Sequence, residues 1–225
     1  MLIASVLKPL NNHIRKSSFI TSLLFGVKVH KQHRIHWDFT TLALKRCLPQ
    51  VVKPHDKILE IGTGPYALLS VFLKKSIDCE VWACDINTDY IEEAAKTAKA
   101  NSTELKVTQS NLFSNINQKF NVIFFNIVYI PRAVGKKLGI FKLHKYETDW
   151  CGGEDGLETI VRFLQDAVLY LRTEGVILMG FNTKYLDQKQ VIQLSKTYGY
   201  SVAVMSGQLF NPSVVLKLKK GNRYE

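Results

Sequence analysis

The chain has 225 residues, an apolar fraction of 46% and a formal net charge of +11. The length fits one α/β domain with a short extension, and the apolar fraction is ordinary for a globular protein with a full core. No apolar run approaches the ~18 residues of a membrane span and no convincing secretory cleavage site is present, so we expect a cytoplasmic protein with no membrane partner.

Residues 1–50 are predicted to form a helical extension that precedes a main domain of residues 51–225. One helix is expected over 17–24. Asp38 is expected to cap a second helix, whose apolar residues recur at helical spacing from Phe39 until Pro49.

Strands and helices alternate in the main domain, which predicts a parallel sheet with crossover helices on both faces. The last two strands are separated only by residues 207–212, so we expect an antiparallel hairpin at one edge. The predicted strands are 57–61, 80–84, 104–109, 120–126, 175–181, 201–206 and 213–219, and the predicted helices are 65–75, 88–100, 156–172 and 187–198.

A glycine turn follows the first of these strands, and an acid ends the second. Glu60 precedes Gly62-Thr-Gly64, and Asp85 closes the next apolar run. Glycines let the backbone approach a ligand closely, and a carboxylate at the second strand end can accept hydrogen bonds from two ribose hydroxyls. Gly62, Gly64 and Ala67 also fit an NAD or FAD site, or a turn without a ligand. Glu60 favours S-adenosylmethionine (SAM), because methyltransferases commonly carry an acid there for the methionine ammonium, whereas dinucleotide folds usually keep that position apolar.

The fourth strand ends in Asn126, followed by Ile-Val-Tyr129-Ile-Pro. Ligands of doubly wound sheets bind beyond the carboxyl ends of the strands. The Asn126 side chain could accept a hydrogen bond from a planar amine or amide NH2 while Tyr129 packs on the planar group. Such a clamp would orient a nitrogen lone pair toward a methyl sulfonium. The alternative is an ordinary strand-end turn with the tyrosine in the core.

Metal chemistry is not predicted. The four cysteines contain no C-x-x-C pair, which favours reduced, buried thiols. The spacing of His30, His33 and His36 would place two of them on one helical face, but no cysteine or carboxylate cluster supports them as ligands.

These motifs resemble the class I methyltransferases that carry Asn-Pro-Pro-Tyr after the fourth strand, and most of all the HemK-like glutamine N5-methyltransferases of release factors, of the single-domain eukaryotic and archaeal type. The likeness spans about residues 36–220 and rests on 58–64, 84–87, 110–113, 126–131, 149–158 and 213–218. It implies an α/β, seven-stranded Rossmann-like sheet with a C-terminal antiparallel hairpin, SAM as cofactor and N-methylation as the reaction.

The resemblance also assigns roles to individual residues. It implies that Glu60 binds the methionine end of SAM, that Gly62 and Gly64 let the backbone come close to the cofactor, and that Asp85 holds the ribose. Ile86 and Asn111 would contact the adenine. Asn126 and Tyr129 would hold the acceptor nitrogen, and Asn126 would also border the cofactor.

Ile127 and Val128 replace both prolines of the family tetrapeptide, which leaves the acceptor open. It could be a protein glutamine, an RNA or DNA base amine or a small-molecule amine, and a non-catalytic SAM-fold binding protein is a further alternative. The family allows a small activating subunit. Restoring both prolines should be tolerated if the backbone follows the family turn.

Five cations lie between Arg132 and Lys145, directly after the proposed clamp, with no obvious acidic partners beyond Glu147 and Asp149. We expect this segment to form a wall of the substrate entrance. Its charge would attract a polyanion or an acidic partner, although a merely solvated basic surface is an equal alternative.

Overall fold

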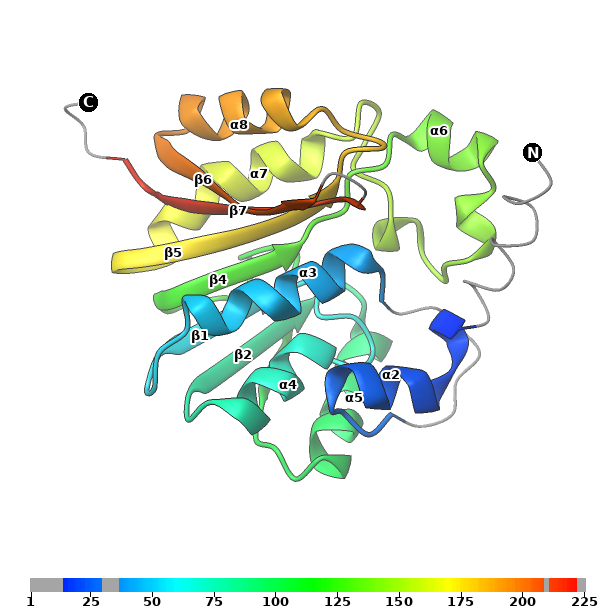
Figure 1. The fold of residues 1–225 in the computed structure, drawn as a ribbon, viewed down its shortest axis with the longest axis vertical. Coiled ribbons are helices and arrows are strands. Elements are labelled where there is room, and N and C mark those ends of the chain that lie inside the picture. Colours follow the sequence, from blue (N-terminus) through cyan, green and yellow to red (C-terminus); the bar gives the residue numbers. More distant parts are fainter. Residues whose placement is uncertain (1–13, 30–36, 209–210, 222–225) are drawn as a thin grey trace.

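A seven-stranded sheet forms the centre of the protein, in a computed structural model that describes residues 14–29, 37–208 and 211–221 (Figure 1). The strand order is β3-β2-β1-β4-β5-β7-β6, and β7 runs antiparallel to both β5 and β6 while the other pairs are parallel. The predicted α/β sheet and its terminal hairpin are therefore confirmed. The strands are β1 (Lys57–Ile61), β2 (Glu80–Asp85), β3 (Lys106–Gln109), β4 (Phe120–Asn126), β5 (Leu171–Asn182), β6 (Tyr200–Gln208) and β7 (Asn211–Lys220).

Helices cover both faces of the sheet, and their side chains define two cores. One core holds α2 (Ser18–Phe25), α3 (Phe39–Cys47), α4 (Leu68–Ser76) and α5 (Thr88–Ala100); the other holds α7 (Glu158–Ala167) and α8 (Gln188–Thr197). Successive strand residues point to opposite faces, so that Phe124 joins the first core and Phe125 the second. This double burial explains why the central strands are almost continuously apolar.

The N-terminal helices share the first core with the main domain. Phe25, Trp37 and Leu44 are buried in the same cluster as Leu69 and Phe124. The structure places the predicted cap at the start of α3, where Asp38 Oδ1 accepts a hydrogen bond from Thr41 N at 2.8 Å and Thr41 Oγ1 accepts one from Asp38 N at 3.1 Å.

Helix α3 lies close against β5 because Gly180 has no side chain. A Cβ at Gly180 would lie 2.7 Å from Thr40 Cγ2 and 2.9 Å from Leu44 Cδ1. This close approach brings the first turn of α3, with Asp38 and Thr41, to the carboxyl end of β4.

Several predicted boundaries are wrong. Helix α4 begins at Leu68 rather than 65, because Ala67 is left-handed with φ 42°. Helix α7 ends at Ala167, a short 3-10 helix (Val168–Tyr170) follows, and β5 begins at Leu171, where the predicted helix had run to 172. Four short elements were not predicted: α6 (Arg132–Lys137) and the 3-10 helices Leu48–Gln50, Ile140–Lys142 and Glu147–Asp149.

All four cysteines are unpaired, and three of them are buried. None of the helices in the described ranges is long and apolar enough to cross a membrane. The residues His30, His33 and His36 lie outside the part of the chain that the structure describes. The described residues contain no group of three or more histidine, cysteine, aspartate or glutamate side chains that could hold a metal ion.

Candidate functional site

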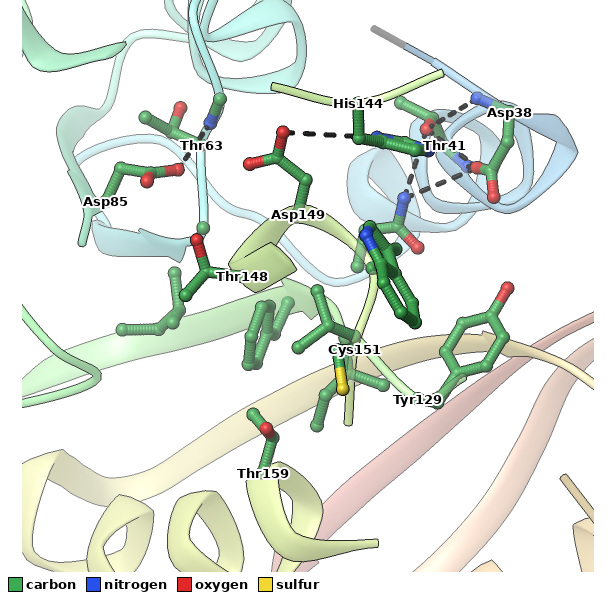
Figure 2. A pocket seen from close by; sticks show the side chains of 18 of the residues that line it. Asp38, Thr41, Thr63, Asp85, Tyr129, His144, Thr148, Asp149, Cys151 and Thr159 are labelled. Carbon is green, nitrogen blue, oxygen red and sulfur yellow. Dashed lines mark hydrogen bonds and ion pairs between the residues drawn. The ribbon is translucent and has the colours of Figure 1, made fainter. Parts of the chain in front are cut away.

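A cavity of about 600 Å³ opens at the carboxyl ends of β1, β2 and β4. The close-up shows Asp85 at left and Asp38 and Tyr129 at right (Figure 2). Further walls come from Arg15, from Trp37 and from the segment 138–151. The cavity brings together all the residues predicted for the site, namely Glu60, Gly62, Gly64, Asp85, Ile86, Asn111, Asn126 and Tyr129.

The turn between β1 and α4 needs both of its glycines. Gly62 and Gly64 have φ values of 64° and 63°, in the left-handed region that favours glycine. A Cβ at Gly62 would lie 2.8 Å from the Phe125 ring, whereas one at Gly64 would point into open space. Gly62 is therefore constrained by packing, and Gly64 leaves room for a ligand to approach the backbone.

Glu60 is a buried carboxylic acid at the end of β1. Its Oε2 accepts hydrogen bonds from Thr63 Oγ1 at 2.7 Å and from Ser70 Oγ at 2.5 Å. Burial raises the pKa of Glu60 to about 7, and the two hydroxyl donors offset only part of that effect. The carboxyl group therefore titrates near neutral pH, where a cationic ligand group would favour its ionised form.

This pKa leads to a prediction for ligand binding. If Glu60 receives the methionine ammonium of SAM, the carboxyl must lose its proton on binding. We expect SAM affinity to fall about tenfold per pH unit below the Glu60 pKa of about 7, with proton release on binding measured by calorimetry in buffers of different ionisation enthalpy. Glu60→Gln should bind SAM weakly with little pH dependence. A wild-type affinity that stays constant below neutral pH would place the ammonium elsewhere.

Asp85 is held firmly at the end of β2. Its Oδ2 accepts a hydrogen bond from Gly64 N and its Oδ1 accepts one from Asn87 N, both at 3.0 Å. Burial raises the pKa of Asp85, and these two bonds work against the rise. Each carboxylate oxygen has a second lone pair, so the group can still accept hydrogen bonds from ribose hydroxyls.

The two residues expected near the adenine lie at the rim. The Ile86 side chain is 38% exposed and offers an apolar surface. Asn111 is exposed, and its Oδ1 accepts a hydrogen bond from Arg162 Nη2 at 3.2 Å. A ligand that uses Asn111 Oδ1 would therefore share this oxygen with the guanidinium.

The Asn126 amide has a defined orientation. Its Nδ2 donates hydrogen bonds to Asp38 Oδ1 at 3.3 Å and to Thr41 Oγ1 at 3.2 Å. Thr41 Oγ1 itself donates to Asp38 Oδ1 at 2.9 Å. A carboxylate only accepts hydrogen bonds, so the NH2 end of the amide must face Asp38. Asn126 Oδ1 is consequently turned to the other side, where it is buried without a hydrogen-bond partner.

Tyr129 lines the same cavity and is 7% exposed, with its ring 6.2 Å from that of Tyr185. Burial raises the pKa of Tyr129 well above its usual value, and the nearby Asp38 carboxylate adds to this rise as the second-largest cause. Its phenol therefore stays protonated near neutral pH, and Tyr129 supplies a ring surface and a hydroxyl rather than a base.

Sequence reasoning assigned Asp38 to the helix cap alone and missed its second role beside Asn126. It also missed how Asp149 anchors the segment over the cavity: Asp149 Oδ2 accepts hydrogen bonds from Tyr90 Oη at 2.7 Å and from Tyr146 N at 3.2 Å. His144 Nδ1 lies 4.0 Å from the same carboxylate, and burial lowers the His144 pKa. The available signals were the acidic and aromatic composition of 146–150 and the family likeness of 149–158.

Two of the five cations have acidic partners besides the expected Glu147 and Asp149. Arg132 pairs with Glu147 and Glu154, which raises the Arg132 pKa, and Lys145 pairs with Asp89. Within the described part of the chain, the remaining cations of this segment, Lys136, Lys137 and Lys142, form no ion pair, although Lys136 is close enough to Glu147 to help lower the Glu147 pKa.

The structure also changes the expectation that both prolines after Asn126 would be tolerated, because position 127 needs its backbone N–H. Ile127 is 2% exposed, and its N–H donates to Gly180 O at 3.0 Å. Ile127→Pro removes this donor and leaves the carbonyl unpaired, so we expect it to lower the free energy of unfolding by about 1–3 kcal/mol in urea titrations.

Val128→Pro is the matched comparison, since no hydrogen bond from Val128 N–H is found among the described residues. This variant should unfold within about 1 kcal/mol of the wild type, because proline at this position removes no backbone hydrogen bond. Equal stability of the two proline variants would contradict the contact with Gly180.

Comparison with known proteins gives a consistent result. The family model described as "Methyltransferase small domain" matches residues 29–127. A putative protein N5-glutamine methyltransferase of Methanocaldococcus jannaschii is 30% identical over 178 residues, covering 79% of this chain and 86% of the relative. A release factor glutamine methyltransferase of Streptococcus pneumoniae is 29% identical over 196 residues, covering 81% of this chain and 70% of the relative.

Solved structures share the fold. A methyltransferase from Pyrococcus furiosus matches with a TM-score of 0.68 at 20% identity, covering 97% of this chain and 99% of that one. A Thermus thermophilus 16S rRNA N2 G1207 methyltransferase, in complex with SAM and guanosine, matches with a TM-score of 0.62 at 19% identity, covering 82% of this chain and 44% of that one.

Proposed function

This chain belongs to the SAM-dependent methyltransferases that carry the methyltransferase small domain, and on that premise we propose that it methylates a planar amide nitrogen, that of a protein glutamine. The relatives named as glutamine methyltransferases support this acceptor. The observation that carries the proposal is the buried, unpaired Asn126 Oδ1 at the carboxyl end of β4. An acceptor oxygen fixed in this way is suited to an N–H of the nitrogen to be methylated.

The residues of the cavity fit SAM. Gly64 leaves open space beside the backbone, Glu60 offers a carboxyl group with a pKa of about 7 for the methionine ammonium, and Asp85 keeps lone pairs free for the ribose. Ile86 and Asn111 border the space that remains for the adenine.

Catalysis in this proposal depends on positioning. When bound, SAM supplies a methyl group on a cationic sulfur: the acceptor nitrogen bonds to the methyl carbon as the carbon–sulfur bond breaks, the electron pair stays on sulfur, and one nitrogen proton leaves to water. Asn126 Oδ1 holds the other N–H and stabilises the positive charge that develops on nitrogen. Asp38 and Thr41 act as positioning residues, because they keep the Asn126 oxygen directed at the acceptor.

Methyl-labelled SAM tests this function. The wild-type protein is incubated with a fractionated cell extract, and each labelled pool is then treated with protease or with ribonuclease. The proposal expects label in a protein pool that protease releases and ribonuclease does not. Label confined to ribonuclease-sensitive material would replace the glutamine acceptor with a base amine.

A base amine of RNA is the second candidate, favoured by the cations Lys136, Lys137 and Lys142 near the cavity, which form no ion pair with any residue that the structure describes. If RNA is the acceptor, the double variant Lys136→Ala/Lys137→Ala should weaken RNA binding without changing SAM affinity, and lower the slope of log affinity against log salt by about two units. The variant Lys189→Ala/Lys196→Ala, on exposed positions of α8, is the charge-matched control. For a glutamine acceptor we expect turnover by both variants to be nearly equal and to change little with salt.

A further inference from the structure

Two buried polar side-chain atoms of the described residues have no hydrogen-bond partner, and they are chemically complementary. Asn126 Oδ1 is an acceptor, and Trp150 Nε1 is a donor. Both residues line the same cavity. Buried polar groups in folded proteins are nearly always paired, so an unpaired donor and an unpaired acceptor in one cavity indicate a ligand that supplies both partners.

The main chain of Trp150 lies beside the segment that follows Asn126. Ile130 N donates to Trp150 O at 3.1 Å, and Ile130 forms a parallel bridge with Cys151. Trp150 is therefore attached to the backbone directly after Tyr129, the residue expected to pack on the acceptor.

Helix α6 packs against the indole ring of Trp150. A Cβ at Gly135 would lie 2.0 Å from Trp150 Cζ3 and 2.6 Å from Cε3, so the carbocyclic edge of the ring packs against this glycine. The N–H lies on the other edge of an indole and thus points away from Gly135. Trp150 is 3% exposed, and its Nε1 is buried.

We propose that Trp150 is a specificity-determining residue that donates its indole N–H to the carbonyl oxygen of the acceptor amide, while Asn126 Oδ1 accepts an N–H of the same group. This inference rests on the proposed function and deepens it. A carboxamide carries an NH2 donor and an oxygen acceptor on one carbon, which matches the two unpaired atoms. An alkyl amine lacks the oxygen, and a carboxylate lacks the N–H.

The two contacts have different consequences for rate. Accepting an N–H increases electron density on the amide nitrogen, whereas donating to the carbonyl oxygen withdraws it. Trp150 therefore contributes to acceptor binding more than to the methyl-transfer step. Both atoms are shielded from water in this structure, so a hydrogen bond to either of them would form away from solvent.

Trp150→Phe tests the kinetic consequence, because phenylalanine keeps an aromatic ring against Gly135 and removes the N–H. We expect the KM for the labelled protein acceptor to rise about tenfold, with kcat and SAM affinity nearly unchanged. Trp82→Phe is the matched control, since Trp82 Nε1 donates to Glu80 Oε1 at 2.9 Å, away from the cavity. A Trp150→Phe enzyme that methylates protein glutamine with the wild-type KM would overturn the inference and leave the proposed function standing.

A second measurement needs no turnover. The chain has three tryptophans, and the indole N–H of Trp37 donates to Thr21 Oγ1 and that of Trp82 to Glu80 Oε1, so these two signals serve as internal references in 15N NMR. With S-adenosylhomocysteine present, N-acetylglutamine N-methylamide should move the Trp150 indole proton downfield, and N-acetylmethionine N-methylamide should not. Equal effects of both probes, or a shift with adenosine but not with the glutamine probe, would overturn the assignment to a carboxamide.

Discussion

Asn126→Ala should lower the rate of methyl transfer by about two to three orders of magnitude while leaving SAM affinity nearly unchanged. Alanine removes the only oxygen that the β4 end offers to the acceptor in this proposal, Asn126 Oδ1, and does not touch Glu60 or Asp85. Transfer is measured with methyl-labelled SAM, and SAM binding by calorimetry. A large parallel loss of SAM affinity would mean that Asn126 acts mainly in the cofactor pocket.

A control variant separates orientation from helix capping. Asp38→Ser keeps a residue that caps helices as well as aspartate does, but a hydroxyl can both donate and accept and so does not fix the direction of the Asn126 amide. We expect unchanged thermal unfolding and a partial loss of kcat. Full activity of this variant would show that Asp38 serves α3 alone.

Asp85→Ala should weaken SAM binding by about 1.5–3 kcal/mol, the scale of hydrogen bonds to a charged group, with the fold intact. The Asp85 carboxylate is the acceptor for Gly64 N and Asn87 N, so its removal affects both the expected ribose contact and the shape of the glycine turn. Asp85→Asn keeps one acceptor oxygen and should bind with intermediate affinity.

Asp78→Ala is the matched control for this variant. Asp78 is exposed, and its carboxylate lies beside His55, outside the residues that line the cavity. Calorimetry should show wild-type affinity for Asp78→Ala. An unchanged affinity in Asp85→Ala itself would remove this residue from the cofactor pocket.

The elements with a clear apolar pattern, either periodic or continuous, could be predicted from the sequence. The helix expected over 88–100 is α5, Thr88–Ala100, and the strand expected over 120–126 is β4, Phe120–Asn126. The start of β5 could not be predicted, because Glu174 takes a left-handed φ of 61° and the pairing with β4 shifts register there. Helix α6 is only six residues long, too short for an apolar period to be visible.

Some features of the candidate site could likewise be predicted from the sequence, and others could not. Glu60, Gly62, Gly64 and Asp85 are close in sequence to the ends of neighbouring parallel strands, so their meeting in one cavity follows from the topology. The contact between Asp38 and Asn126 joins residues 88 positions apart and depends on α3 packing over Gly180. No local pattern encodes that contact, and the orientation of the Asn126 oxygen depends on it.

The most direct test of the proposed acceptor is to locate the transferred methyl group. The protein pool that takes up label is incubated with SAM carrying a deuterated methyl group, digested and sequenced by mass spectrometry, in parallel with Asn126→Ala. We expect one deuterated methyl group on the side-chain nitrogen of a glutamine, present with the wild-type enzyme and absent with the variant. A methyl group on a lysine, on an oxygen or only on nucleic acid, or glutamine methylation that persists in Asn126→Ala, would contradict the assignment of Asn126 as the residue that presents an amide nitrogen for methylation.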